Sequence, residues 1–384
     1  MHLVSVDTYI AFGNGKKRPA REGHGSFKVF GSNGVIGHCD EFNSPAGTII
    51  IGRVGSFCGS LHYSPEQCWV TDNAIKGIAK TGADARYCYY LLLTKDLHAL
   101  RGGSGQPLIN QTSLKSLEVP ERSFADQKAI AHILGTLDDK IELNQKMNQT
   151  LEEMAKAIFK SWFVDFDPVR AKAEGRPTGL PPEISDLFPD ELVDSEIGET
   201  PKGWVVTDLA NSAAIKGGKQ IKNVSNDSSG CVPVYGGNGI MGWTDRSNVD
   251  SFTVIFGRVG ANCGSVNWVY DKAWIGNNAS SVTPKENNEF LLQVLLMKDF
   301  QGMRSGSAQP FISNTSLGQL RFVYPVNGPA KMYCEVARPI RLLQENSKRE
   351  IKILSELRDT LLPKLISGEL RIPDAEKFLE EAGI

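Results

Sequence analysis

Short apolar runs separated by glycine, asparagine and proline fill residues 1–122 and 205–325. Two of these runs, at 47–51 and 252–256, are rich in β-branched and aromatic residues and are typical of short strands. Residues 85–97 and 288–298 have helical spacing of apolar positions instead. The pattern predicts two mixed α/β (α+β) units in which sheet predominates.

Residues 126–164 and 339–366 show a 3-4 spacing of apolar positions that predicts two long helices. Pro339 suits a first helical turn, and Pro363 should kink the second helix near its end. Asn144 and Ser347, 203 positions apart, interrupt the two stripes at the same place, and a polar residue there can fix the register of a coiled coil. We expect an antiparallel coiled coil; the alternative is two separate amphipathic helices. The predicted seam residues are Ile133, Leu137, Asn144, Met147, Leu151, Met154, Ile158, Leu343, Ser347, Leu354, Leu357 and Leu361.

The chain thus falls into five predicted segments, residues 1–122, 123–167, 168–204, 205–325 and 326–384. The third has six prolines between 168 and 204 and many acidic residues, which indicates an extended connector. A helix of thirty-odd residues spans about 50 Å. An antiparallel pair of this length would hold the two mixed units at opposite ends of a rod.

The two mixed units are copies of one another. Residues 52–60 (GRVGSFCGS) return as residues 257–265 (GRVGANCGS), 205 positions later. Residues 101–114 (RGGSGQPLINQTSL) return as residues 304–317 (RSGSAQPFISNTSL), 203 positions later. A pseudo-two-fold repeat of this length is domain-sized, so the chain should do one thing at two places.

Composition places the chain among soluble globular proteins, with 41% hydrophobic and 22% charged residues. The absence of a membrane-length apolar run and of a signal-peptide pattern predicts a cytoplasmic protein without membrane association. The net charge is −2, but residues 1–122 and 205–325 are mildly basic, whereas residues 123–200 carry 16 acidic against 8 basic residues. Seven scattered cysteines favour neither a disulfide framework nor a zinc ribbon, and the repeat-equivalent Cys58 and Cys263 are expected to be buried core residues.

No catalytic motif emerges. The chain lacks a phosphate loop, a nucleophile elbow and an HExxH zinc signature. All six histidines lie in the first half, and His38 is replaced by Trp243 in the second copy, so a shared activity cannot use histidine. The glycine spacing at 31–37 does not fit a dinucleotide loop and predicts a turn. We predict neither a cofactor nor a metal site.

Binding chemistry is better supported. Residues 13–21 and 216–222 combine glycine with lysine and arginine, which suits a loop along a phosphate backbone; a merely solvated basic loop is the alternative. Lys17 matches Lys222 at the 205 offset. Arg53 and Arg258, in identical GRVG contexts, suit either a phosphate or guanine contact or a scaffold role. If the copies read different sequences, base readers should lie where the copies differ. The candidate DNA-binding residues are Lys16, Lys17, Arg18, Arg21, His38, Arg53, Lys216, Lys219, Lys222, Trp243 and Arg258.

Over nearly its whole length the chain resembles the DNA sequence-specificity (S) subunits of type I restriction–modification systems. The resemblance rests on the two GRVGxxCGS blocks, the two SxQPxIxxTSL blocks, and residues 151–168, 187–190, 198–204 and 357–370. It implies two target recognition domains, each reading half of a split site in double-stranded DNA. It also implies that two long helices set the spacer and dock partner subunits.

The same resemblance implies a subunit without catalytic activity. Two methylation subunits would bring S-adenosylmethionine and methylate adenine N6, and restriction subunits would supply ATP- and Mg-dependent translocation and cleavage. One departure is that residues 201–206, the lead-in to the second copy, have no equivalent before Val4, which leaves open whether the opening strand of the first copy is intact. The alternatives are a stand-alone DNA methyltransferase or nuclease, and a helix-mediated scaffold with no DNA role.

Overall fold

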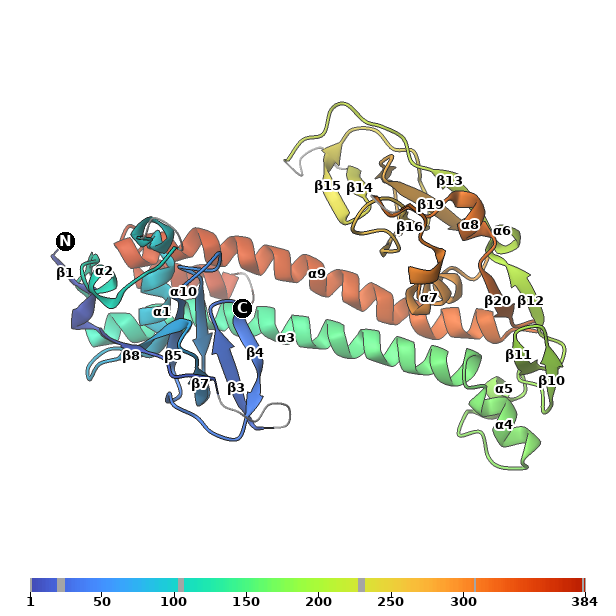
Figure 1. The fold of residues 1–384 in the computed structure, drawn as a ribbon, viewed down its shortest axis with the longest axis horizontal. Coiled ribbons are helices and arrows are strands. Elements are labelled where there is room, and N and C mark those ends of the chain that lie inside the picture. Colours follow the sequence, from blue (N-terminus) through green and yellow to red (C-terminus); the bar gives the residue numbers. More distant parts are fainter. Residues whose placement is uncertain are drawn as a thin grey trace. The chain divides into compact units, whose positions relative to one another are not determined.

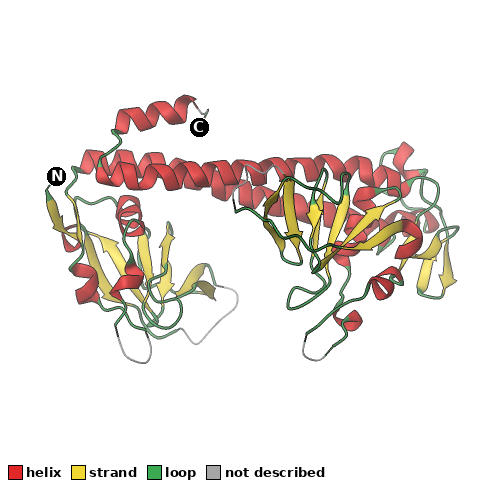
Figure 2. Cartoon of the chain, turned by 90° about the horizontal axis from the view of Figure 1, so that it is seen from above, coloured by secondary structure: helices red, strands yellow, loops and turns green. Residues whose placement is uncertain are grey.

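The computed structural model describes residues 2–18, 25–102, 107–226, 232–306, 309–381 and 383 (Figure 1). The chain divides into two compact units, Met1–Lys146 with Ser347–Ile384 and Met147–Asn346. Each unit contains one mixed α/β head and parts of two long helices (Figure 2). We call residues 1–122 the first head and residues 205–325 the second head.

The first head contains two sheets and one strand pair. The four-stranded sheet has the order β2-β8-β5-β6 and is antiparallel, and the three-stranded sheet has the order β4-β3-β7 with β3 and β7 parallel. Its central strand β5 is buried on both faces, as expected for a continuous run of isoleucine. The strands are β1 Leu3–Ser5, β2 Ile10–Asn14, β3 Phe27–Gly31, β4 Gly34–Cys39, β5 Thr48–Gly52, β6 Leu61–Ser64, β7 Cys68–Val70, β8 Ala74–Ala79 and β9 Glu118–Pro120. The helices are η1 Val6–Thr8, α1 Ala85–Leu93, η2 Leu97–Leu100 and α2 Gln111–Lys115.

The second head repeats this topology, with sheets β13-β19-β16-β17 and β15-β14-β18. Even the register shift in the hairpin recurs, at Val29/Phe30 and at Val234/Tyr235. The strands are β12 Val205–Asp208, β13 Ala213–Gly217, β14 Val232–Gly236, β15 Gly239–Thr244, β16 Thr253–Gly257, β17 Val266–Val269, β18 Trp274–Ile275, β19 Ala279–Pro284 and β20 Arg321–Tyr324. The helices are α6 Leu209–Ser212, α7 Asn288–Met297, η4 Gln301–Met303 and α8 Asn314–Gly318. The predicted mixed units, with helices near 85–97 and 288–298, are confirmed.

At the ends of the heads the structure answers one open question and corrects one expectation. The first head has an intact opening strand, because β1 pairs antiparallel with β9 as β12 does with β20. The 168–204 segment is not a simple extended connector. It forms α4 Asp167–Ala173, α5 Pro182–Ser185 and the hairpin β10 Leu192–Ser195 with β11 Gly198–Pro201. Buried apolar side chains anchor this segment, since Val169 and Phe188 are at most 2% exposed. The prediction considered only its prolines and acidic residues.

The long helices are α3 Phe124–Phe163 and α9 Pro329–Ser367, and α10 Ile372–Glu381 follows. In the first unit the Arg358 guanidinium lies 2.8 Å from the Asp138 carboxylate, and Lys140 lies 3.6 Å from Glu350. In the second unit the Tyr333 hydroxyl donates to the Ala155 carbonyl at 3.1 Å. Within each unit, residue numbers rise along one helix as they fall along the other, so the predicted antiparallel pairing is confirmed. α9 starts ten residues before the predicted start, which places Pro339 inside the helix.

Most predicted seam residues are buried or half-buried, but three are not. Ile133, Leu137, Asn144, Ser347, Leu354 and Leu361 are buried, and Leu151, Ile158 and Leu357 are half-buried. The assignments of Met147, Met154 and Leu343 are wrong, because their side chains are 40%, 49% and 52% exposed. The 3-4 spacing continues instead through Asn148 and Ala155 on α3 and through Gln344 on α9. Polar and small residues hold the seam there, so choosing apolar residues selected the wrong neighbours.

Each unit has its own hydrophobic core, into which its head and its helix segments all contribute. The core of the first unit is largely aliphatic around α3 and α9, with Ile130, Leu365 and Ile366 buried. The second unit places Tyr333, Trp162 and Phe163 at the positions 203 residues away from these three. Cys58 and Cys263 are 0% and 1% exposed, as expected for core residues.

Candidate nucleic-acid interface

The GRVG loops that leave β5 and β16 have the same backbone hydrogen bonds in both heads. The Arg53 N–H donates to the Asn73 carbonyl and the Arg258 N–H to the Asn278 carbonyl, both at 3.0 Å. The Arg53 and Arg258 carbonyls then accept from Ile109 at 3.0 Å and from Ile312 at 2.9 Å. The main chain of both arginines is therefore part of the scaffold of its head.

Shared side chains hold these loops in place. The Cys58 thiol donates to the Arg53 carbonyl at 3.2 Å, and the Cys263 thiol to the Arg258 carbonyl at 3.4 Å. Burial raises the pKa of both thiols, so they stay protonated as donors at neutral pH. Arg101 and Arg304, also shared, donate to the carbonyls of Cys58 and Cys263 at 2.9 and 2.7 Å. Residues common to the copies thus build the loop, as predicted.

The side chains of Arg53 and Arg258 have different surroundings. Both are half-buried. The Arg258 Nε–H donates to the Asn277 carbonyl at 3.2 Å. The Arg53 guanidinium has no hydrogen-bond or ion-pair partner among the described residues.

The basic loops follow β2 and β13, and the structure fixes one point of their alignment. The N–H of Lys16 donates to the Val70 carbonyl at 3.0 Å, and that of Lys219 donates to the Ile275 carbonyl at 2.9 Å. Lys16 is therefore the counterpart of Lys219, at an offset of 203. The offset is 205 at β3 and β14, so the second head has two extra residues between Lys219 and β14. The pairing of Lys17 with Lys222 stays a prediction.

A glycine precedes each of these paired lysines for a steric reason. A Cβ on Gly15 would lie 1.9 Å from the Thr71 carbonyl oxygen, and one on Gly218 would lie 2.0 Å from the Gly276 carbonyl oxygen. This close approach of two backbones leads the chain out of the sheet and presents both lysines to solvent, where both are exposed.

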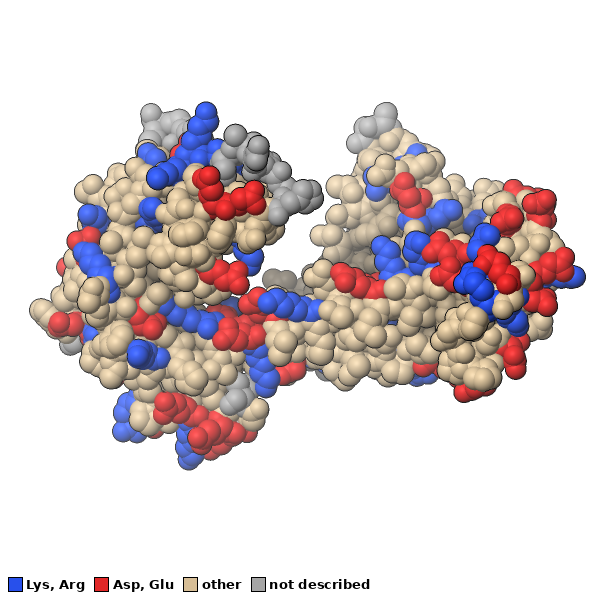
Figure 3. Space-filling view, turned by 90° about the horizontal axis from the view of Figure 1, so that it is seen from below, with Lys and Arg blue, Asp and Glu red and all other residues tan. Residues whose placement is uncertain are grey.

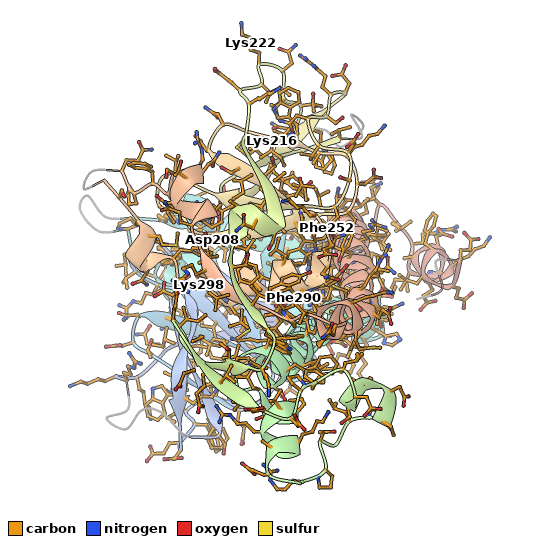
Figure 4. The ribbon with its side chains drawn as sticks, turned by 90° about the vertical axis from the view of Figure 1, so that its right-hand side faces the viewer. Asp208, Lys216, Lys222, Phe252, Phe290 and Lys298 are labelled. Carbon is orange, nitrogen blue, oxygen red and sulfur yellow. The ribbon has the colours of Figure 1, made fainter. Side chains whose placement is uncertain are left out.

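The remaining basic candidates lie on or beside these loops. Lys17, Lys216 and Lys222 are exposed, and Figure 4 shows Lys222 farther out than Lys216 and both away from the core residue Phe290. Arg18 donates to the Ile36 carbonyl at 3.2 Å, which ties the first loop to the β3–β4 hairpin. Arg21 lies outside the described residues.

The pair in which the copies differ lies on the same hairpin strand of each head. His38 is exposed on β4, and Trp243 is half-buried on β15. The main chain of Trp243 exchanges two hydrogen bonds with Ser225 at 2.8 and 2.9 Å, which ties the second basic loop to its hairpin. Each head thus brings a basic loop and a variable hairpin position together.

Sequence reasoning missed a set of exposed apolar side chains at repeat-equivalent places. Val35 and Ile36 correspond to Ile240 and Met241 on the hairpins, and Leu108 corresponds to Phe311 beside the GRVG loop. Their exposed fractions are 38–51%. The repeat itself contained the signal: apolar residues recur at these positions in both copies within glycine-rich turns, where a core is not expected.

The described residues also bear on a metal site, a carboxylate site and a membrane span. No group of three or more His, Cys, Asp or Glu side chains in the described residues is placed to hold a metal ion. The carboxylates of the connector are engaged in ion pairs, Glu199 with Arg170 at 3.0 Å and Glu191 with Lys202 at 2.5 Å. Figure 3 shows acidic and basic side chains intermixed over this part of the second unit. Of the helices in the described residues, none has the length and apolar character needed to cross a membrane.

Comparison with known proteins decides what this arrangement belongs to. A family model described as the type I restriction modification DNA specificity domain matches residues 10–153. The MjaIX specificity subunit of Methanocaldococcus jannaschii is 27% identical over 77% of this chain and 72% of its own length. The HindI specificity subunit of Haemophilus influenzae is 28% identical over 69% of this chain and 71% of its own. The chain is therefore similar to type I restriction–modification specificity subunits over most of its length, and residues 10–153 match their DNA specificity domain.

A solved structure has the same fold as this chain. The crystal structure of the S subunit of a type I restriction–modification system from M. genitalium superposes with a TM-score of 0.70, at 19% identity, over 95% of this chain and 96% of the other. The likeness extends to both heads and both long helices. The fold of this chain, with two heads and two long helices, is therefore the fold of that S subunit.

Proposed function

We propose that this specificity subunit reads a bipartite target in double-stranded DNA, one part per head, with the spacer between the parts set by the coiled coil of α3 and α9. The observation that carries the proposal is the contrast within each head. The GRVG loop is held by the same bonds in both heads, whereas the neighbouring hairpin position is His38 in one and Trp243 in the other. An identical frame with a different side chain at the hairpin suits two readers of different sequences.

Within each head we assign contacts by chemistry. Lys16 and Lys219 stand at equivalent, exposed positions and suit phosphate contacts, which position the protein without reading sequence. Lys17, Arg18, Lys216 and Lys222 add positive charge to the same loops. Arg53 and Arg258 suit phosphate or a guanine edge, and His38 and Trp243 suit base contacts.

We further propose that the subunit is non-catalytic and acts in the cytoplasm within a larger complex. Two methylation subunits would bind S-adenosylmethionine and methylate adenine, and restriction subunits would bind ATP and Mg. The coiled coil would dock the methylation subunits. This chain would then contribute recognition and spacing, and its partners would contribute every bond-breaking step.

Methylome sequencing of a host that expresses the complex tests the proposal. We expect one split motif of two short parts with a fixed spacer, methylated only when this chain is present. The matched control is the same host with the methylation subunits alone, which should show no such motif. An unsplit motif, or methylation that persists without this chain, would contradict the bipartite reading.

A further inference from the structure

In the first unit the head meets the helix pair at an acidic position. The Tyr90 hydroxyl of α1 donates to Oδ2 of Asp138 on α3 at 2.6 Å. Arg358 of α9 donates to Oδ1 of the same carboxylate at 2.8 Å. Next to it, Arg86 of α1 donates to both oxygens of Asp139 at 2.6 and 3.0 Å, and to the Gly135 carbonyl at 3.1 Å. We call these five side chains, Arg86, Tyr90, Asp138, Asp139 and Arg358, the first seat.

In the second unit the head meets the helix pair at a basic position. Arg341 of α9 is 1% exposed. Its Nη2 donates to Oε1 of Gln293 on α7 at 2.6 Å, and its Nη1 donates to Oε1 of Gln344 at 2.9 Å and to the Glu152 carboxylate of α3. The Arg341 guanidinium also lies 5.1 Å from the centre of the Trp268 ring.

Glu289, one helical turn before Gln293 on α7, is 5% exposed. Burial raises the pKa of Tyr333, the Arg341 charge lowers it and the Glu289 charge raises it, so both charges act on the same hydroxyl. We call the six side chains Glu152, Trp268, Glu289, Gln293, Arg341 and Gln344 the second seat.

The two seats occupy equivalent places with their charges exchanged. A single offset of 203 takes Arg86 to Glu289, Tyr90 to Gln293 and Asp138 to Arg341. In the first seat the Asp138 carboxylate lies on the long helix α3, and the head contributes hydrogen-bond donors. In the second seat the Arg341 guanidinium lies on the long helix α9, and the head contributes hydrogen-bond acceptors. The partner on the other helix has changed as well, since the same offset takes Glu152 to Ser355 and Arg358 back to Ala155.

We propose that these inverted charges determine which segment of the helix pair each head packs against. The first head on the second seat would bring the Tyr90 hydroxyl to the Arg341 guanidinium in place of the Gln293 acceptor, with Arg86 one turn away in place of Glu289. The second head on the first seat would bring Gln293 to the Asp138 carboxylate in place of the Tyr90 donor, with Glu289 in place of Arg86. A buried charge without its partner is strongly destabilising, so each wrong combination excludes itself. The proposal concerns how the heads are held and does not depend on what they bind.

The test uses variants of the full-length chain in which the charges of the second seat are changed to those of the first seat. Arg341→Glu should lower the thermal midpoint on the order of 10 °C, because it buries an acid among acids. It should also speed amide hydrogen exchange in α7 while leaving α1 unchanged. Adding Glu152→Arg restores the pair between the helices and should recover part of the loss. Adding Glu289→Arg puts a cation of the head close to the new acid and should recover more.

The decisive comparison is the sign of the Glu289→Arg effect. It should destabilise the wild-type chain and stabilise the Arg341→Glu/Glu152→Arg chain. The same sign in both backgrounds would overturn the proposal. Lys202→Glu, at a side chain 62% exposed in an ion pair with Glu191, is the matched charge-reversal control and should shift the midpoint little.

The first seat supplies the same test at a less buried place, should Arg341→Glu not fold. Arg86→Glu should lower the midpoint and speed exchange in α1, and Asp139→Arg should rescue both. No rescue by Asp139→Arg would count against the proposal as well.

Discussion

The two heads agree around the GRVG loop and differ where they meet the long helices. Around the loop, Cys58 and Cys263 donate to the same carbonyl, and Arg101 and Arg304 close the same turn. At the helices, equivalent positions have exchanged charge. Side chains that satisfy buried backbone groups have few substitutes, because an unpaired carbonyl in the interior is costly. A contact between two side chains can be rewritten when both partners change together.

The largest expected effect comes from exchanging a whole head. Replacing residues 1–122 by the corresponding head of another specificity subunit should change one part of the methylated motif completely and leave the other part and the spacer unchanged. The reciprocal graft of residues 205–325 is the matched control. Methylome sequencing measures both, and a change in both parts after one graft would contradict separate readers. A donor head that keeps arginine and tyrosine at positions 86 and 90 should assemble better than one that does not.

The second prediction concerns the unlike cores of the two units. The Phe290 ring is 1% exposed and packs against Phe163 and Phe159, with ring centres 5.0 and 5.5 Å away. Phe290→Ala should lower the free energy of unfolding by about 3–5 kcal/mol, because it leaves a cavity among rigid rings. Phe311→Ala in the same head, at a ring 44% exposed, should cost less than about 1 kcal/mol. Urea unfolding measures both, and equal costs would show that the aromatic cluster is not the core of this unit.

Much of the fold was predictable because its sequence pattern occurs twice in the chain. The patterns that predict strands and helices recur at offsets of 203 and 205, and a pattern that occurs in both copies is not expected by chance. The register of the seam was not predictable beyond Asn144. There the helices bury Ala155 and Gln344 and half-bury Asn148, and hydrophobic spacing cannot identify a seam built from polar and small residues.

The site was predictable in its scaffold and less so in its loops. The shared arginines and cysteines stand where equivalent bonds are made. The offset between the copies changes from 203 to 205 inside the basic loop, and the bonds of Lys16 and Lys219 show that the change lies after these two residues. The seats were hidden for a different reason: their equivalent residues have opposite charges, so comparing the copies marks them as unrelated.

The third prediction separates phosphate contacts from base contacts. Lys16→Ala and Lys219→Ala should each weaken binding to specific and random duplexes alike, and each should reduce the slope of log K against log salt by about 1. His38→Ala should instead weaken specific binding and leave the slope unchanged. Lys377→Ala, on α10 outside both heads, is the control for a lost positive charge. Gel-shift titrations at several salt concentrations measure these slopes, and a flat salt response of the wild type would rule out DNA backbone binding.

The smallest expected effect is on how the free energy of unfolding depends on pH. It concerns His62, whose equivalent in the second head is Asn267. Burial lowers the pKa of His62 below its ordinary value of 6.5, and its Nε2 is buried without a hydrogen-bond partner among the described residues. The unfolded chain therefore binds a proton more readily than the folded one. The stability that depends on neutral His62 is complete above about pH 6.5 and is lost as the pH falls below it.

His62→Asn, which gives the first head the residue of the second, should remove this contribution. The charged side chains around the same hollow, Lys28, Arg86, Asp138, Asp139 and Glu142, are identical in both proteins and cancel in the comparison. The difference in unfolding free energy between wild type and His62→Asn, measured at about pH 7.5 and about pH 5.5, should move in favour of the variant at the lower pH. A difference that stays constant with pH would mean that His62 titrates alike in the folded and unfolded chains, and that burial at this position affects both heads equally.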